Sequence, residues 1–285
     1  MKKLHHISLM VLLACPMTML SCGFSSAPKN TNETALEASN DSAAEDSIAN
    51  EEKVSFTVKG VTFNMILVKG GTFTMGATPE QGKDAGKDEK PAHQVTLSDY
   101  YIGETEVTQA LYEAVIGENP SDKKGADLPV ETVDGGDCDW FAKKLSELTG
   151  REFRLPTEAE WEFAARGGNK SKGYKYSGSN NLSDVAWFND MENKSQPVKG
   201  KAPNELGIYD MSGNVDEYCA DDYARYSKEN QTNPMIEAEE SVGQVLRGGS
   251  FADDKGSTCR VSYRAYTPGY VFGSVGFRIA MSAKK

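Results

Sequence analysis

Apolar and polar residues alternate along the first part of the chain that has regular apolar content. Such alternation is typical of strands with one buried face, and glycines mark the turns between them. Gly70-Gly71 forms one of these turns, and the charged segment Ala77–Lys90 is expected to be an exposed loop. The strands expected before the first helix are Val54–Val61, Phe63–Val68, a turn with its strand at Lys69–Gly76, and Gln94–Ile102.

The pattern then changes to a helical period. Thr108 can cap a helix that ends before Gly117, and a second helix is expected over Gly136–Leu148. On that second helix Cys138 falls on the apolar face, so we interpret it as a core thiol. The third helix begins at the capping box formed by Thr157 with Glu160, and Gly167 ends it. We interpret Glu158 and Glu160 as capping and solvated residues.

After residue 168 the chain shows only short apolar segments among Gly, Asn, Ser and Asp. Few helices combined with long irregular segments predict an α+β fold, and they exclude a repeat protein, a dinucleotide-binding fold and a β-sandwich. The whole stretch from 54 to 283 is long enough to form one large domain.

Residues 207–218 combine a predicted turn with a group of oxygen donors. Gly213 and Asn214 both tolerate positive φ, so they favour a turn. The donors around it are Asp210, Asn214, Asp216 and Glu217. Carboxylates and carbonyls suit a hard cation such as calcium. A polar turn whose side chains cap its own backbone explains the same residues, and spacing alone favours that second interpretation.

The beginning of the chain has the layout of an exported lipoprotein. Residues 1–22 resemble a signal peptide, with Lys2 and Lys3 before an apolar stretch and Leu20-Ser21-Cys22 at its end. We expect lipid on Cys22, the alternative being a cleaved signal that releases a soluble secreted protein. Residues 23–53 are rich in Ser, Ala, Asn and acids, which predicts a flexible acidic tether ahead of the domain at 54–283.

Charge, histidine and cysteine content exclude several functions. The net charge of −11 argues against nucleic acid as a partner. Without the signal peptide His93 is the remaining histidine, which excludes multi-histidine zinc or iron sites; we expect it to be structural or at the surface. Cys138, Cys219 and Cys259 allow at most one internal disulfide, and the sequence leaves the pairing open.

A series of motifs in the domain resembles the sulfatase-modifying-factor family, which includes the formylglycine-generating enzymes. The resemblance covers about Ile66 to Ala280, and its most specific part is Arg154–Gly168. The motifs are Gly70–Gly76, Glu106–Gln109, Arg154–Gly168, Pro203–Val215, Arg247–Phe251 and Gly276–Arg278. The resemblance implies a formylglycine-generating-enzyme-like fold, of the C-type-lectin-like complex kind, with little regular secondary structure and structural calcium.

The same resemblance implies metal ligands in the stretch 207–218. It places calcium at the Asn214 side chain, the Val215 carbonyl and the Glu217 carboxylate, with Asn189 and Asp190 as a further cation site. The family usually has tryptophan where this chain has Asp216, so that residue either adds a ligand or exposes the edge of the site.

The catalytic branch of the family uses copper(I) held by two cysteines separated by four residues. Two soft thiolates suit copper(I), and hard oxygen donors do not replace them. Here Cys259 lacks its partner, because Asp254 and Arg264 occupy the positions five residues away. Copper is therefore not expected. Cys259 is the one candidate catalytic residue, and a structural role, with Cys219 as a possible disulfide partner, is the competing interpretation.

These observations favour a non-catalytic binding or scaffold protein of the cell envelope. The expected location is the bacterial outer membrane or cell surface, through the lipid at Cys22, with a protein or peptide client as partner. The alternative is an oxidoreductase of the formylglycine-generating type that acts on a cysteine or another residue of a client. Oxidation of a Cys-x-Pro-x-Arg peptide distinguishes the two.

Overall fold

The computed structural model describes residues 51–269 and 271–283. Cys22 and nearly all of the tether predicted at 23–53 lie outside the described residues. Within the described part, no helix has both the length and the apolar character needed to cross a membrane.

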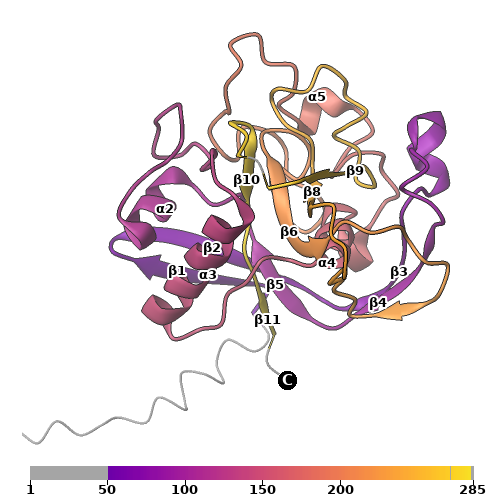
Figure 1. Cartoon of the computed structure of the whole chain (residues 1–285), viewed down its shortest axis with the longest axis horizontal. Coiled ribbons are helices and arrows are strands. Elements are labelled where there is room, and N and C mark those ends of the chain that lie inside the picture. The colour runs from indigo at the N-terminus through magenta and orange to yellow at the C-terminus, as the bar shows by residue number, and fades with distance from the viewer. Residues whose placement is uncertain (1–50, 270, 284–285) are drawn as a thin grey trace, which may run out of the picture. The chain divides into compact units, whose positions relative to one another are not determined.

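Three small sheets and a few short helices make up the domain (Figure 1). The first sheet has the order β1-β2-β5-β11 and is antiparallel throughout. Its strands are β1 (Lys53–Val58), β2 (Val61–Val68), β5 (Tyr100–Gly103) and β11 (Ala280–Ser282). The last strand of the chain thus pairs with a strand from its first half, which closes the domain.

The strands of the other two sheets alternate along the chain with those of the first. The order β3-β4-β7 joins β3 (Gly71–Met75), β4 (His93–Leu97) and β7 (Gln231–Thr232). The order β10-β6-β8-β9 joins β10 (Val275–Phe277), β6 (Asp216–Asp222), β8 (Gln244–Arg247) and β9 (Arg264–Thr267), with β10 parallel to β6. The expected strand at Gln94–Ile102 is two strands, because the exposed pair Ser98-Asp99 interrupts it and sends β4 and β5 into different sheets.

The predicted helices form, with the predicted caps at Thr108 and Thr157 and a further one, not predicted, at Asp134. Thr108 accepts a bond from the Leu111 amide at the start of α2 (Gln109–Ile116), and Gly117 ends it in the left-handed conformation. A capping box at Asp134 starts α3 (Gly135–Thr149). Both helices lie beside β1 and β2 (Figure 1), and their apolar faces, with Cys138 among them, complete the first hydrophobic cluster.

The third helix, α4 (Glu158–Ala165), is buried along its whole length, and it contacts β3, β4, β6 and β8. The capping box of Thr157 and Glu160 is present. The prediction that Glu158 and Glu160 are solvated is wrong, because both are buried and paired with arginines. A second hydrophobic cluster surrounds this helix, with Trp161 fully enclosed.

Within the described residues, three further short helices lie outside the sheets. The short helices are η1 (Pro79–Asp84), η2 (Gly168–Lys170) and α5 (Leu182–Val185). The first of them lies in the segment expected to be an exposed loop, and that segment also buries Gln81 and Glu89. Glu89 is buried because Arg260, far along the chain, forms an ion pair with it. A third, small hydrophobic cluster contains Tyr176, Val185, Ala186 and Cys259.

Candidate binding pocket and the buried polar centre

The turn predicted at Gly213-Asn214 is present and has the expected backbone. Gly213 has φ of +81° and Asn214 has φ of +64°. A side-chain carbon on Gly213 would lie 2.3 Å from the carbonyl oxygen of Trp187, so glycine is required here by space as well as by conformation. The Asn214 amide donates to the same Trp187 carbonyl at 2.8 Å, which holds the turn against the preceding loop.

Hydrogen bonds through Glu106 and Gln196 link Asn214 to two other residues predicted as cation ligands, Val215 and Asp190. Its side-chain oxygen accepts from the Gln196 amide at 2.9 Å, and its side-chain nitrogen donates to Glu106 at 3.0 Å. The Val215 amide also donates to Glu106. Gln196 in turn donates to the Asp190 carboxylate at 2.8 Å. Asn214, Val215 and Asp190 therefore belong to one hydrogen-bonded region.

Asn189 and Glu217 have different surroundings. Asn189 is exposed, and its amide donates to the Asp253 carbonyl. Glu217 is fully buried, and Arg278 binds it through two nitrogens, each 2.6 Å from a carboxylate oxygen. The Trp161 indole nitrogen donates to Glu217 at 2.7 Å as well. Glu217 therefore has an arginine, and not an oxygen-rich shell, as its neighbour.

The region around Arg278 contains more buried carboxyl groups than basic groups. Burial and the nearby carboxylates of Asp210 and Glu217 raise the pKa of Glu106 well above its usual value. Burial raises the pKa of Asp210 to about 6. Oδ2 of Asp210 accepts from the Lys199 amide at 2.8 Å, whereas its Oδ1 is buried without a hydrogen-bond partner. Oxygen donors of this kind suit calcium.

A tight metal-ligand cluster is not formed in the described part of the chain. No three His, Cys, Asp or Glu side chains there converge as they do around a bound ion. The oxygen donors of the region are of a type that calcium binds, but they do not converge on one point, and both Glu217 oxygens accept from Arg278. Asp216, which stands where the family usually has tryptophan, accepts a hydrogen bond from the Gly249 amide at 3.1 Å.

Further arginine–glutamate pairs hold the irregular half of the domain to the buried helix α4. Arg264 binds both oxygens of Glu158, at 2.8 and 2.6 Å, and its guanidinium lies over the Tyr223 and Tyr226 rings. Arg247 pairs with Glu162. Arg247 belongs to the motif Arg247–Phe251, whereas Arg264 lies between the last two motifs. The family's motif residues therefore form the framework of the fold in this chain.

The described cysteines are free and buried, and each lies in a different hydrophobic cluster. Cys138 belongs to the first cluster, Cys219 to the second and Cys259 to the third. The suggested Cys219–Cys259 disulfide is therefore wrong. Burial raises the pKa of the Cys259 thiol to about 12. Arg264, where a partner thiol would stand, is instead in the ion pair with Glu158.

His93 has a structural environment, in agreement with the expectation. It is buried, with one ring nitrogen 3.1 Å from the Pro91 carbonyl and the other 3.2 Å from Gln231. No serine or acid completes a catalytic arrangement among these contacts.

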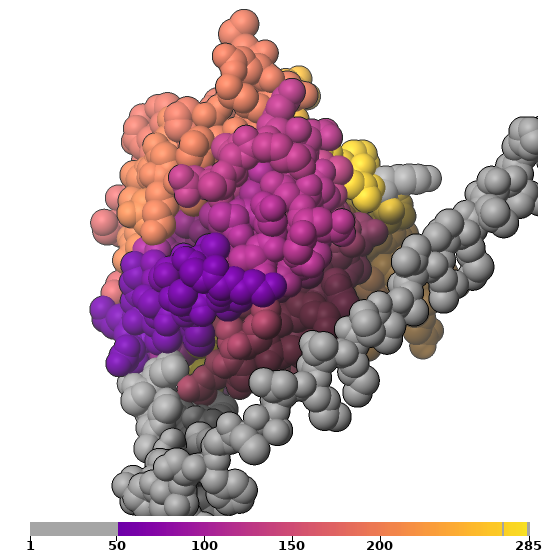
Figure 2. Space-filling view, turned by 90° about the vertical axis from the view of Figure 1, so that its left-hand side faces the viewer, coloured from indigo at the N-terminus to yellow at the C-terminus, as the bar shows by residue number. Residues whose placement is uncertain are grey.

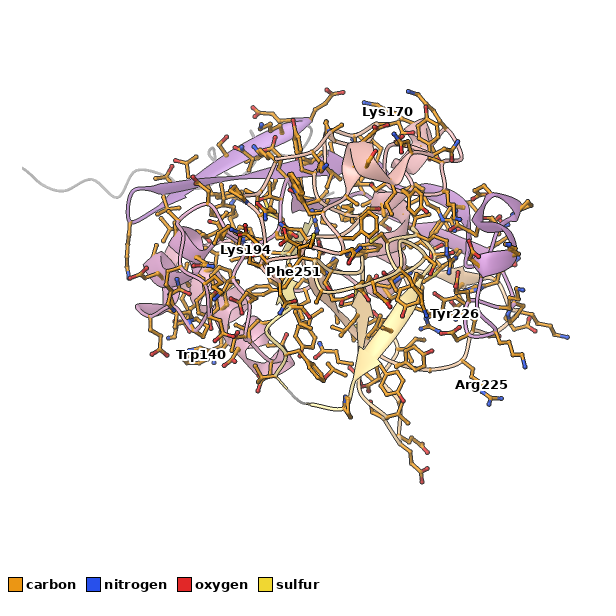
Figure 3. All side chains as sticks on the ribbon, turned by 90° about the horizontal axis from the view of Figure 1, so that it is seen from above. Trp140, Lys170, Lys194, Arg225, Tyr226 and Phe251 are labelled. Carbon is orange, nitrogen blue, oxygen red and sulfur yellow. The ribbon has the colours of Figure 1, made fainter. Side chains whose placement is uncertain are left out.

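A polar pocket of about 600 Å³ is the strongest candidate for a binding site. The segment after α2 and the segment around residue 190 both contribute to its lining, and they are joined by a 2.9 Å bond from the Val198 amide to the Asp127 carbonyl; the two segments adjoin on the face shown in Figure 2. Lys194 and Phe251 lie close together there, away from Arg225 and Tyr226 (Figure 3). The lining residues are Asp122, Lys123, Glu131, Glu192, Asn193, Lys194, Ser195, Phe251, Ala252, Phe272, Gly273 and Ser274.

Sequence reasoning did not select any residue of this pocket. The predicted residues Asp190 and Asn214 lie one contact away from it, because they position the loop that carries Lys194 and Ser195. One local signal was present: Glu131 is an acid between apolar residues, Val130 and Val133, that are both buried. The amides of Asp122 and Lys123 donate to this buried carboxylate, which lies in the wall of the pocket.

Comparison with known proteins identifies the family to which this fold and these motifs belong. The Sulfatase-modifying factor enzyme 1-like domain family matches residues 52–283, and the chain belongs to this family. The resemblance drawn from the motifs, and the α+β formylglycine-generating-enzyme-like fold, are confirmed.

Individual relatives differ in what they are named for. The chain is 33% identical to "Chaperone protein LppX" of Paenibacillus barcinonensis, over 71% of this chain and 83% of that protein. It is 28% identical to a formylglycine-generating enzyme of Streptomyces coelicolor, over 78% of this chain and 90% of the enzyme. Among solved structures, Treponema denticola variable protein 1 superposes with a TM-score of 0.73 and 31% identity, covering 82% of this chain and all of that one.

Proposed function

We propose that the chain is a lipid-anchored, non-catalytic binding or scaffold domain of the cell envelope. The observation that carries the proposal is the separation of the cysteines. Copper(I) chemistry of the family's catalytic kind needs two thiolates at one site. The three described thiols lie in three different clusters and are buried, and a thiol with a pKa of about 12 is neutral at ordinary pH.

The 600 Å³ pocket is the part of the surface proposed to bind a client. It combines exposed charged groups with the exposed ring of Phe272 and the buried ring of Phe251, which is typical of sites that fix a ligand by a few polar contacts. The loops that form its walls are tied to the core by Gln196, Asn214 and Glu106. A relative whose name is that of a chaperone supports a role in contact with another protein.

The proposed anchor is the lipid on Cys22, which would attach the domain to the outer membrane or cell surface. The first described strand begins at Lys53, so the tether has about 30 residues. A flexible chain of that length has an end-to-end distance on the order of 30 Å. That distance would let the domain stand off the membrane with its pocket free to meet a client.

Calcium is proposed as a structural ion of this domain, held by Asn214, the Val215 carbonyl and Glu217, with Asn189 and Asp190 as a second site. The excess of buried carboxylates and the unpartnered oxygen of Asp210 support it. The ion would share Glu217 with Arg278, and it would stabilise the turn that supports the pocket walls. It would take no part in redox chemistry.

Thiol reactivity and copper(I) retention test the non-catalytic proposal. Native protein should not react with Ellman's reagent, whereas the unfolded chain should expose its thiols. In competition with a copper(I) chelator, wild type and Cys259→Ser should retain the same negligible amount of metal. Tight copper(I) binding that is lost in Cys259→Ser would contradict the proposal and favour an oxidase.

A further inference from the structure

The pocket described above has a buried acid with no basic partner. Glu131 is 2% exposed, and within the described part of the chain no lysine, arginine or histidine forms an ion pair with it. Its Oε1 accepts from the amides of Asp122 at 2.7 Å and Lys123 at 3.3 Å, and Thr132 donates to its Oε2. These bonds fix the carboxylate in the pocket wall, but they do not neutralise its charge.

A second acid faces the same space. Gly273 lines the pocket, and the point that a side-chain carbon on it would occupy is 3.3 Å from Asp122 Oδ2 and 3.9 Å from Glu131 Oε2. The Thr132 hydroxyl is also 3.9 Å from that point. Because glycine has no side chain, a ligand atom can reach oxygens of both acids from one place.

An unpartnered hydroxyl is an independent observation that points to a ligand. Ser195 lines the pocket and is 3% exposed, and its Oγ is buried without a hydrogen-bond partner. A buried polar atom left unpaired costs about 1–3 kcal/mol, so such atoms are usually paired with a protein group, an ordered water or a ligand. A donor on a ligand would satisfy this hydroxyl.

The remaining charges of the lining favour a cation over an anion. Glu192 and Lys194 pair with each other, which leaves Asp122 and Glu131 against Lys123. Lys123 is exposed, whereas Glu131 is buried, where a charge interacts most strongly. The lining therefore presents acceptors and negative charge at depth, with the partly exposed ring of Phe272 near its edge.

We propose that the pocket binds a protonated primary amine on an aliphatic stem, presented by a peptide or protein client. An ammonium group has three donors and no acceptor, which matches two carboxylates and a hydroxyl. Its aliphatic stem would pack on Phe251 and Phe272. The amine is a lysine side chain or a free chain N-terminus. This inference rests on the proposed binding function and names the chemistry that the client brings.

Blocked peptides test the inference by titration calorimetry with the full-length protein. The probes are Ac-Gly-Gly-Lys-Gly-Gly-amide, the same peptide acetylated on the lysine amine, and Leu-Gly-Gly-Gly-Gly-amide, whose free N-terminal amine is carried by an aliphatic residue. Either the lysine peptide or the peptide with the free N-terminus should bind, and the one that binds identifies the source of the amine. If the lysine peptide binds, acetylation of its amine should weaken the affinity about tenfold or more. Equal affinity for the acetylated peptide, or no binding of either amine, would overturn the inference.

Variants of the lining locate the binding. Glu131→Gln and Asp122→Asn should each lower the affinity for the amine peptide about tenfold, because each removes one charge-assisted hydrogen bond to the amine. The matched control is Glu147→Gln, an exposed acid outside the pocket that pairs with Lys144, and it should change the affinity less than about twofold. If Glu131→Gln does not fold, the exposed Asp122 carries the test. Wild-type affinity in the folded acid variants would overturn the inference.

The amine inference and the proposed function fail in different ways. Loss of amine binding leaves a non-catalytic domain with a different ligand. Oxidation of a client cysteine would reject the non-catalytic function whatever the pocket binds.

Discussion

The Arg278–Glu217 pair gives the sharpest prediction about what holds this fold together. Both side chains are fully buried, and the pair joins β10's end to β6. Arg278→Met keeps much of the volume of the arginine stem but removes its charge. It also deletes the bonds from Arg278 to the carbonyls of Gly103 and Tyr209, both 3.1 Å long.

The size of the destabilisation follows from the hydrogen bonds that Glu217 loses and keeps. Glu217 loses two charge-assisted bonds of 2.6 Å and keeps only the one from Trp161. Hydrogen bonds to charged groups contribute about 1.5–3 kcal/mol each, and removing one partner of a buried pair costs about 3–5 kcal/mol. We therefore expect Arg278→Met to lower the free energy of unfolding by about 3–5 kcal/mol, which is a large part of the stability of a typical domain.

Denaturant titration followed by tryptophan fluorescence measures this loss. The double variant Arg278→Met with Glu217→Gln should recover part of the loss, since no buried charge is then left alone. The control is Lys144→Met, which breaks the exposed pair with Glu147 and should leave the unfolding midpoint nearly unchanged. A cost below about 1 kcal/mol for Arg278→Met, or no recovery in the double variant, would refute the reasoning.

Two further predictions concern calcium and pH. If calcium is bound at about 100 times its Kd, chelation should remove about 2.7 kcal/mol and lower the melting temperature by roughly 5–10 °C; an unchanged melt with no metal by elemental analysis would reject the ion. Burial, and then the Glu158 carboxylate, raise the pKa of Asp221 to about 7, above its unfolded value. Its contribution to stability is therefore complete at low pH and is lost as pH rises toward 7, so Asp221→Asn should cost about 1–3 kcal/mol more at about pH 5 than at about pH 8. Equal costs at both pH values in denaturant titrations would contradict that assignment.

Local signals predicted the first half of the fold well. The capping residues Thr108 and Thr157 and the terminator Gly117 act within one turn of a helix, so the sequence around them determines the outcome. The period of apolar residues likewise places α2 and α3 correctly, because their buried faces are regular.

Long-range pairing explains what local reasoning missed. Glu158 looked solvated because its partner Arg264 is 106 residues away, and no nearby residue reveals the pair. The pocket shows the same limitation, since Glu131 and Ser195 come together only through loops whose paths depend on turns and buried polar contacts. The motif at 207–218 was identified as important, but the structure shows its Glu217 paired with an arginine from the last motif.

The central claim is that this member of the family binds through its pocket and does not oxidise. The most direct measurement is a mass-spectrometric time course of a Cys-x-Pro-x-Arg peptide incubated with the full-length protein, copper and oxygen. The peptide should keep its cysteine, in wild type and in Cys259→Ser alike. Formylglycine in the wild-type reaction would contradict the claim, and its loss in Cys259→Ser would identify the thiol responsible.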